Sequence, residues 1–400
     1  MAFEIPSTNE LTQVQARIYR AIGQTKRIAV IGGPGTGKTV LAILAANGSN
    51  KRALFLTYSR PLSELISKHG RRMSVSTCHS WIFWVAKSIW GEEVAKQYTK
   101  DYQIQWEAII SAYKKLNESA REENRYDTVF VDEGQDLPDG FYRFLSLIAD
   151  KVFVTFDDAQ EVGNEGANRP EGGPLNIDLD FQRNRILNAL GMQEDFYDLI
   201  ENFRNTRQIE RVAKLFYTNY EINDFTLRME TSVSDGPLPK VYVGENKEKI
   251  VRMIFNDMRN DLSASCAILV PSNREYDEWM ELLQREFSQD EALKKYFYYK
   301  LSKNTNISED NVGEPGLFLM TMRASKGLEF DSVYVIVSDN TMLNTNSEKN
   351  AFYVALTRAR SNLSLVFEHR NKSAAWKIID ENEAFFDFAH AEDDRAEMLI

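Results

Sequence analysis

Short runs of apolar residues recur through the first half of the chain, and the apolar residues between these runs have a different spacing. The runs RIAVIGG, ALFLTY, TVFVDE and KVFVTF are rich in Val, Ile and Phe and have the length of strands. Continuous apolar runs of this kind are typical of strands buried on both faces of a parallel sheet. The longer stretches that separate them have helical periodicity. The pattern therefore predicts an α/β fold in which helices cover a parallel sheet.

A second series of apolar runs follows in the other half of the chain: KVYVGE, CAILVP, LFLMTM, SVYVIV and LSLVFE. Two series of similar length favour two α/β domains over one very large sheet. A chain of 400 residues is long for one domain and comfortable for two. We place the boundary near residues 196–202, which predicts one domain over residues 1–200 and a second over residues 201–400.

Three segments depart from the alternation of strands and helices. Residues 82–124 form a predicted helical insertion in the first domain, rich in Trp, Tyr, Lys and Glu. Residues 164–176 are rich in Gly and Pro and are predicted to be an exposed loop. From Asp380 onward the chain is acidic with scattered aromatic residues, a pattern equally compatible with a docked helix and with a loose tail.

The composition narrows the class of protein. Apolar residues make up 43% of the chain and charged residues 27%, as in soluble globular proteins. The two cysteines have no spacing typical of a disulfide framework or a zinc site, and the four histidines are scattered along the sequence. The first residues lack the pattern of a signal peptide, and no apolar run approaches the roughly 20 residues that span a bilayer. We expect a cytoplasmic protein without a membrane partner.

The net charge of −11 argues against a protein that coats nucleic acid through its overall charge, because that mode of binding needs a basic surface. It does not exclude a narrow basic channel, since the local potential governs a groove.

The segment GGPGTGKT follows one predicted strand, precedes a predicted helix, and fits the phosphate-loop pattern G-x-x-x-x-G-K-[ST]. Its glycines allow backbone N–H groups to turn toward phosphate oxygens, and the helix N-terminus adds a favourable dipole. Lys38 is expected to reach the β and γ phosphates of a nucleotide, and the Thr39 hydroxyl to bind Mg²⁺. The predicted nucleotide-binding residues of this loop are Gly32, Gly33, Pro34, Gly35, Thr36, Gly37, Lys38 and Thr39.

Two adjacent acids end the third apolar run, in the stretch VFVDEGQDLP. In phosphate-loop enzymes Mg²⁺ is held by the loop Ser/Thr and by an acid at the end of a neighbouring strand, which predicts Asp132 as the second metal ligand. Glu133, the next residue, is placed to polarise the attacking water. The sequence therefore predicts ATP and Mg²⁺ as cofactors, and catalytic roles for Lys38 and Glu133.

The motifs around this site resemble those of superfamily 1 DNA helicases of the UvrD/Rep/PcrA type. DEGQD fits their second motif, and LTQVQ places Gln15 at the position of the glutamine that reads adenine in that family. LTYSRPLSEL and TCHSW resemble two motifs that run along single-stranded DNA, which implies Tyr58, His79 and Trp81 as DNA-binding residues. The apolar neighbours of Trp81 are also compatible with a place in the core.

The resemblance continues to about residue 367. TFDDAQ implies that Gln160 senses the γ-phosphate, and ENFRNT implies adenine stacking by Phe203 and an arginine finger at Arg204. YVALTRAR implies a second arginine finger at Arg358.

LMTMRASKGLEFDSVYV is the most specific of these matches. It implies a ribose contact at Glu329 and nucleic-acid contacts at Thr321 and Arg323. The resemblance as a whole implies two tandem RecA-like domains with parallel sheets flanked by helices, and ATP hydrolysis at their interface.

The chain also departs from the family pattern. Gln160 is followed by EVGNEGANR, without the aromatic residues that usually stack on DNA, and Arg323 stands where a histidine is usual. The insertion at residues 82–124 is short, as a reduced accessory domain would be, and residues 217–315 leave little room for a second one. ATPase activity and translocation are therefore better supported than processive unwinding.

The main hypothesis from the sequence is an ATP-dependent translocase or helicase on single-stranded DNA. Two alternatives stay open at this point. One is a regulatory ATPase that senses DNA for a partner such as a nuclease, for example in phage defence, and the other is a motor that acts on RNA.

Overall fold

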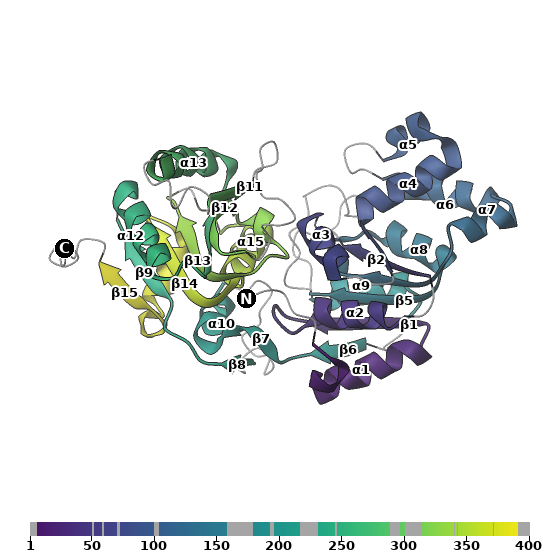
Figure 1. Ribbon diagram of the computed structural model, residues 1–400, viewed down its shortest axis with the longest axis horizontal. Helices are drawn as coiled ribbons and strands as arrows, with labels where there is room; N and C mark the ends of the chain where they lie inside the picture. Colours follow the sequence, from purple (N-terminus) through teal and green to yellow (C-terminus); the bar gives the residue numbers. More distant parts are fainter. Residues whose placement is uncertain are drawn as a thin grey trace. The chain divides into compact units, whose positions relative to one another are not determined.

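The computed structural model describes residues 6–49, 52–57, 60–69, 73–99, 104–157, 179–192, 196–216, 231–244, 246–288, 297–300, 314–339, 341, 343–370 and 372–390. The described chain divides into two compact units, one ending at Ile200 and the other beginning at Glu201 (Figure 1). Tyr58 and Gln160, predicted as functional residues, lie outside the described ranges. None of the described helices is long and apolar enough to cross a membrane.

The first unit is built on a six-stranded sheet in the order β3-β2-β4-β5-β1-β6. All five neighbouring pairs in it are parallel. The strands are β1 (Arg27–Gly32), β2 (Ala53–Thr57), β3 (Met73–Thr77), β4 (Tyr126–Val131), β5 (Ala149–Phe156) and β6 (Phe196–Leu199). Four of the runs predicted from the apolar pattern are thus strands of one sheet.

The helices of the first unit are α1 (Gln13–Gln24), α2 (Lys38–Asn47), α3 (Arg60–His69), α4 (Cys78–Trp90), α5 (Glu92–Tyr98), α6 (Trp106–Lys115), α7 (Glu118–Glu123), α8 (Asp139–Ile148) and α9 (Leu179–Ala189). The predicted insertion is helical and consists of most of α4 together with α5, α6 and α7, which lie close together in Figure 1.

The insertion shares the hydrophobic core of the first unit. Trp81 and Val85 of α4 and Ile109 of α6 belong to the same buried cluster as Phe144 of α8 and Val131 of β4. Because these side chains are removed from water together, the insertion is anchored to the sheet by the hydrophobic effect and forms one body with it.

The second unit contains a seven-stranded parallel sheet in the order β11-β12-β10-β13-β14-β9-β15. The strands are β9 (Lys240–Val243), β10 (Ser265–Val270), β11 (Phe297–Lys300), β12 (Gly316–Thr321), β13 (Phe330–Val337), β14 (Ala359–Phe367) and β15 (Asp387–His390). A separate parallel pair joins β7 (Asn202–Thr206) to β8 (Ser232–Ser234). The described helices are α10 (Arg207–Lys214), α12 (Lys247–Asn260), α13 (Asn273–Ser288), α15 (Asn346–Leu356) and α16 (Ala374–Asp380).

One face of the second sheet is covered by α12 and α13, whose apolar sides share a buried cluster with residues of β10, β12 and β13. The predicted fold class, two α/β domains with parallel sheets and flanking helices, is confirmed. Beyond Asp380, where the sequence left a helix and a loose tail open, the chain adds β15 as an edge strand beside β9.

Candidate nucleotide and nucleic-acid site

The phosphate-loop segment joins the end of β1 to the start of α2. Gly35 and Gly37 have positive φ angles of 72° and 83°, a left-handed conformation that glycine adopts without strain. A Cβ atom on Gly37 would lie 2.8 Å from the Gln15 side-chain nitrogen, and one on Gly32 would lie 2.6 Å from the Thr36 hydroxyl. Gly37 is thus required for its backbone conformation and for space, and Gly32 is required for space.

Lys38 lies against the backbone of its own loop. Its ammonium donates to the carbonyl oxygens of Gly32 and Gly33 at 2.6 and 2.7 Å and lies 3.9 Å from an Asp157 carboxylate oxygen. The loop therefore holds a buried positive charge beside the helix N-terminus, as the phosphate-binding prediction requires.

The Gln15 side-chain amide binds the start of α1 at one end and the phosphate loop at the other. Its Oε1 accepts from the Thr12 backbone N–H at 3.1 Å, which closes the capping box of α1, and its Nε2 donates to the Thr36 carbonyl at 3.3 Å. The side chain expected to read adenine thus also connects the start of α1 to the phosphate loop.

Thr39 and Asp132, the two predicted metal ligands, are in direct contact. The Thr39 hydroxyl donates to Asp132 Oδ2 at 2.6 Å, although the two residues are 93 positions apart in the sequence. The Thr155 hydroxyl of β5 binds the other carboxylate oxygen. Burial first, and then the negative charge of Glu133, raise the pKa of Asp132; the two hydroxyls and Lys38 act in the opposite direction.

These residues fit a magnesium ion. Mg²⁺ prefers hard oxygen ligands, and the contact joins a hydroxyl and a carboxylate beside the phosphate loop. A buried carboxylate whose pKa is raised by its surroundings gains stability when a cation approaches. Thr39 and Asp132 are therefore the residues that would hold Mg²⁺ together with nucleotide phosphates.

Glu133 is the one non-glycine residue in the described chain with a positive φ, 59°. Such a left-handed conformation is unfavourable for most residues and is often found at functional positions. It turns the chain sharply between β4 and the 3₁₀ helix Gly134–Asp136.

Gln135 connects Glu133 to the next strand. Its Nε2 donates to Glu133 Oε2 at 2.6 Å, and its Oε1 accepts from the Asp157 backbone N–H at 3.1 Å. Gln135 is buried, so these two bonds fix the Glu133 carboxylate relative to the end of β5. The sequence offered only the internal glutamine of DEGQD as a signal for this role.

In the second unit, Glu329 is bound by two arginines. Arg204 of β7 donates to its Oε1, and Arg360 of β14 donates to its Oε2 from Nε at 3.0 Å and from Nη2 at 2.9 Å. Burial opposes ionisation, but the charges and hydrogen bonds of the two arginines outweigh it and lower the pKa of Glu329 to about 2. Arg204 and Glu329 were both predicted from the motifs, whereas Arg360 was not.

Arg358, the other predicted finger, is deeply buried at 1% exposure. Its guanidinium donates to the carbonyl oxygens of Val354 and Leu328 and to the Thr357 hydroxyl. These bonds attach the start of β14 to α15 and to the segment that precedes β13. Phe203, the predicted adenine platform, is 46% exposed on β7.

The predicted nucleic-acid residues of the two units lie at carboxyl ends of strands. His79 is half-buried in the first turn of α4, directly after β3, and burial lowers its pKa. Thr321 ends β12, its hydroxyl accepts from the Ala324 N–H at 3.3 Å, and Arg323 is exposed.

The assignment of Trp81 to nucleic-acid binding is wrong. Its side chain is 4% exposed and packs against Phe141 and Phe144 of α8, with ring centroids 6.1 and 5.8 Å away, so no base can stack on it. Trp84, on the outer side of the same helix, is 60% exposed, and the Lys87 ammonium lies 4.8 Å from its ring centroid. Trp84, which the sequence interpretation did not single out, is thus the more exposed of these two side chains.

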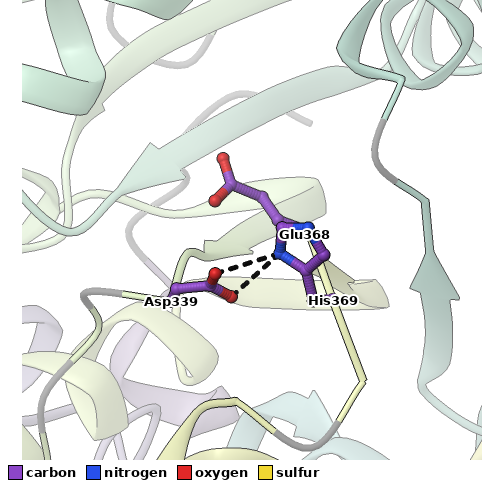
Figure 2. A group of neighbouring side chains, drawn as sticks. All are labelled: Asp339, Glu368 and His369. Atoms are coloured by element: carbon purple, nitrogen blue, oxygen red, sulfur yellow. Dashed lines mark hydrogen bonds and ion pairs between the residues drawn. The ribbon is translucent and has the colours of Figure 1, made fainter.

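A group of possible metal ligands lies elsewhere in the second unit, where Asp339, Glu368 and His369 follow the ends of β13 and β14 (Figure 2). His369 Nδ1 lies 3.0 Å from an Asp339 oxygen. Lys372 approaches the same carboxylate at 3.3 Å, and Lys247 approaches Glu368 at 3.0 Å. Because lysines already neutralise both carboxylates, the group is an ion-pair network between strand ends.

The parallel fold and the glycine loop of the first unit define a nucleotide-binding protein of the phosphate-loop class. Two family models match parts of the chain: residues 15–164 match an AAA domain, and residues 288–370 match the UvrD-like helicase C-terminal domain. The second match supports, for this part of the chain, the resemblance to UvrD-like helicases that the motifs predicted.

Among solved structures, the chain is similar to the C-terminal domain of a possible DNA helicase from Lactobacillus plantarum WCFS1. The two are 20% identical, the match covers 46% of this chain and 98% of that one, and the TM-score is 0.33. No curated protein matches the chain.

Proposed function

We propose that the protein hydrolyses ATP and uses the cycle to move along single-stranded nucleic acid, with DNA as the preferred strand. The observation that carries this proposal is the contact of 2.6 Å between Thr39 and Asp132, with Glu133 next to it. It brings the hydroxyl of the phosphate loop, a buried carboxylate and the candidate base into one place. A glycine turn without catalytic function does not require this combination.

In the proposed reaction, water attacks the γ-phosphate of ATP, and ADP and inorganic phosphate are released. Lys38 exchanges the carbonyls of Gly32 and Gly33 for phosphate oxygens, and Glu133 accepts a proton from the attacking water. Gln135 keeps the Glu133 carboxylate oriented toward that water. Thr39 and Asp132 would hold Mg²⁺, which would supply charge neutralisation to the phosphates.

The second unit contributes positive charge to the same reaction. Arg204 is the candidate finger, because its bond to Glu329 is an ion pair that a phosphate can replace. Arg358 is the second candidate, although its three bonds to its own unit favour a supporting role in the described conformation. Gln160, outside the described residues, is proposed to sense the γ-phosphate.

The nucleoside is proposed to contact Gln15, Phe203 and Glu329. The nearly half-exposed ring of Phe203 offers a face on which a base can stack. The Gln15 amide already spans α1 and the loop, so adenine would be read at the entrance to the phosphate site.

Nucleic acid is proposed to contact Tyr58, His79, Thr321 and Arg323, and Trp84 replaces Trp81 in this set. An exposed aromatic ring with a lysine over its face combines base stacking with a positive charge, the two features of single-strand binding that tolerate any sequence.

The experiment that tests the function is the rate of ATP hydrolysis with no nucleic acid, single-stranded DNA, duplex DNA or RNA. We expect the largest stimulation by single-stranded DNA. Glu133→Gln is the control, because it should bind ATP yet hydrolyse it very slowly. Greater stimulation by RNA than by DNA would show that RNA is the preferred nucleic acid. An absence of stimulation by all three nucleic acids would reject the translocase proposal.

Trp81 and Trp84 of α4 provide a matched pair for the nucleic-acid surface. Trp84→Ala should weaken single-stranded DNA binding by about tenfold with little change in stability. Trp81→Ala should lower the free energy of unfolding by about 3 kcal/mol through the cavity it leaves in the core. Fluorescence anisotropy of a labelled oligonucleotide and thermal unfolding measure the two effects. If Trp84→Ala binds single-stranded DNA as tightly as the wild type, Trp84 does not contact nucleic acid.

A further inference from the structure

The Glu329 carboxylate divides its two oxygens between two arginines that come from different strands. Oε1 accepts from Arg204, and Oε2 accepts two donors of Arg360, at 3.0 and 2.9 Å. All three residues belong to the second unit, and each keeps part of its side chain accessible to solvent. The arrangement places one acid between two cations.

The two arginines differ in how firmly they are held. Arg360 binds Glu329 through two donors and has Asp331 on its other side, with Nη1 at 4.0 Å from an Asp331 oxygen. Asp331 in turn accepts from the N–H and the hydroxyl of Ser265, both at 2.9 Å. In Arg204, by contrast, Nε has no hydrogen-bond partner within the described chain. Arg204 is therefore bound to Glu329 through one donor, whereas Arg360 is bound through two.

We propose that Arg360 is a positioning residue that sets how tightly Glu329 retains Arg204. This inference rests on the proposed ATP hydrolysis, in which Arg204 leaves Glu329 for the γ-phosphate. Arg360 keeps the carboxylate neutralised during that exchange, so Arg204 can depart without leaving a bare buried charge. Without Arg360, Arg204 would be the one cation left on Glu329 among its contacts in the described chain, and the exchange would cost more free energy.

The first test is the steady-state kinetics of ATP hydrolysis by Arg360→Ala and Arg360→Lys. Arg360→Ala should lower kcat about tenfold and raise the KM for ATP only about threefold, because the main loss is in the transition state. Arg360→Lys keeps the charge without the paired donors and should recover part of kcat. Arg207→Ala is the matched control, because it removes another arginine ion pair of the same unit, with Asp235 at 2.6 Å. Unchanged kinetics in Arg360→Ala would overturn the inference.

The second test asks whether Arg360 acts through Glu329. In a double-mutant cycle, adding Arg360→Ala to Glu329→Gln should change kcat less than about twofold, because the carboxylate on which Arg360 acts is already gone. Independent losses that multiply in the double variant would show that Arg360 acts by another route and would overturn the proposal. Thermal unfolding of all four proteins identifies any variant that has lost its fold.

A binding measurement separates the failure of this inference from the failure of the proposed function. If the wild-type protein does not hydrolyse ATP, the proposed function fails. The same cycle is then measured as the affinity for a fluorescent ATP analogue. We expect Arg360→Ala to weaken binding about threefold in the wild-type background and not at all in Glu329→Gln. Equal weakening in both backgrounds overturns the positioning role of Arg360.

Discussion

Asp132 directly follows the interior strand β4 and Glu329 directly precedes the interior strand β13, yet the surroundings of these two carboxylates act on them in opposite directions. Asp132 is bound by the hydroxyls of Thr39 and Thr155, and its pKa is raised. Glu329 is bound by the guanidinium groups of Arg204 and Arg360, and its pKa is lowered to about 2. The difference lies in the partners, since burial opposes the charge of both acids.

The comparison separates a site that needs a cation from one that already has two. Hydroxyl groups orient the Asp132 carboxylate without neutralising it, so a divalent ion is the partner that completes this site. The charge of Glu329 is already balanced by two arginines, one of which, Arg204, is exchanged for phosphate in the proposed function. The residues of the first unit thus fit Mg²⁺, whereas those around Glu329 do not call for an added cation.

The largest expected effect comes from removing the carboxylate that lacks a cation. Asp132→Asn keeps the shape of the side chain and loses the charge that would hold Mg²⁺. We expect ATP hydrolysis to fall by at least about a thousandfold, since metal neutralisation of the phosphates contributes several kcal/mol. Hydrolysis measured against Mg²⁺ concentration is the readout. A variant that keeps most of its activity at ordinary Mg²⁺ would place the metal elsewhere.

A smaller effect is expected when Glu133 loses its orienting amide. Gln135→Leu fills the same space but removes both the bond to Glu133 and the bond to the Asp157 N–H. Hydrolysis should fall about ten- to a hundredfold while nucleotide affinity stays near the wild-type value. Gln135→Glu, which keeps the length of the side chain and adds an acid beside Glu133, should also be slow. Wild-type turnover in Gln135→Leu would show that Glu133 needs no such support.

The smallest effect concerns stability in acid. The pKa of Glu329 is lowered from its ordinary value of 4.5 to about 2, so its ionised form stabilises the fold above pH 4.5, and this contribution is lost as the pH falls toward 2. We expect the free energy of unfolding of the wild-type protein to drop by about 2 kcal/mol more over this range than that of Glu329→Gln. Denaturant unfolding at several pH values measures it, with Glu92→Gln as an exposed ion-pair control. If the free energies of unfolding of the wild type and of Glu329→Gln change equally with pH, the lowered pKa of Glu329 is contradicted.

Much of the fold and part of the site could be predicted from local sequence. Continuous apolar runs identified the buried strands, because strands covered on both faces exclude polar residues. The phosphate loop could be predicted because its residues Gly37, Lys38 and Thr39 are consecutive and form a short recognisable motif. Edge strand β15 has only four residues, too few for a clear alternation, and its position depends on the neighbouring strand β9.

Other parts of the site depend on tertiary contacts that a linear pattern does not contain. The partners of Gln135 lie on two different strand ends, and Arg360 acquires its role only when β14 lies beside β13. Trp81 and Trp84 of α4 could have been distinguished from the sequence. Trp81, Val85 and Ile89 repeat at the spacing of a buried helix face, whereas the residues one turn before and after Trp84 are Ser80 and Ser88.

The short connection between β12 and β13 has a mechanical consequence. Thr321 is level with Val270 at the end of β10, whereas Ser332 is level with Cys266 near its start, so residues 322–329 run back along almost the whole depth of the sheet. The distance to cover, including the width of the intervening strand, is roughly 22 Å. The nine steps from Thr321 to Phe330 include a 3₁₀ turn and a second turn closed by the bond from the Leu328 N–H to the Ser325 carbonyl, so they reach at most about 26 Å.

The connection between β12 and β13 is thus barely longer than the distance it spans. Arg358 donates a hydrogen bond to its Leu328 carbonyl oxygen, next to Glu329. If a bound nucleic-acid strand displaced Thr321, the displacement would therefore be transmitted to Glu329 along residues 322–329. The surrounding core would not need to move. Inserting two glycines after Arg323 would leave the residues at both ends unchanged and disconnect their motions. In such a variant, we expect basal ATP hydrolysis to persist and its stimulation by single-stranded DNA to be lost.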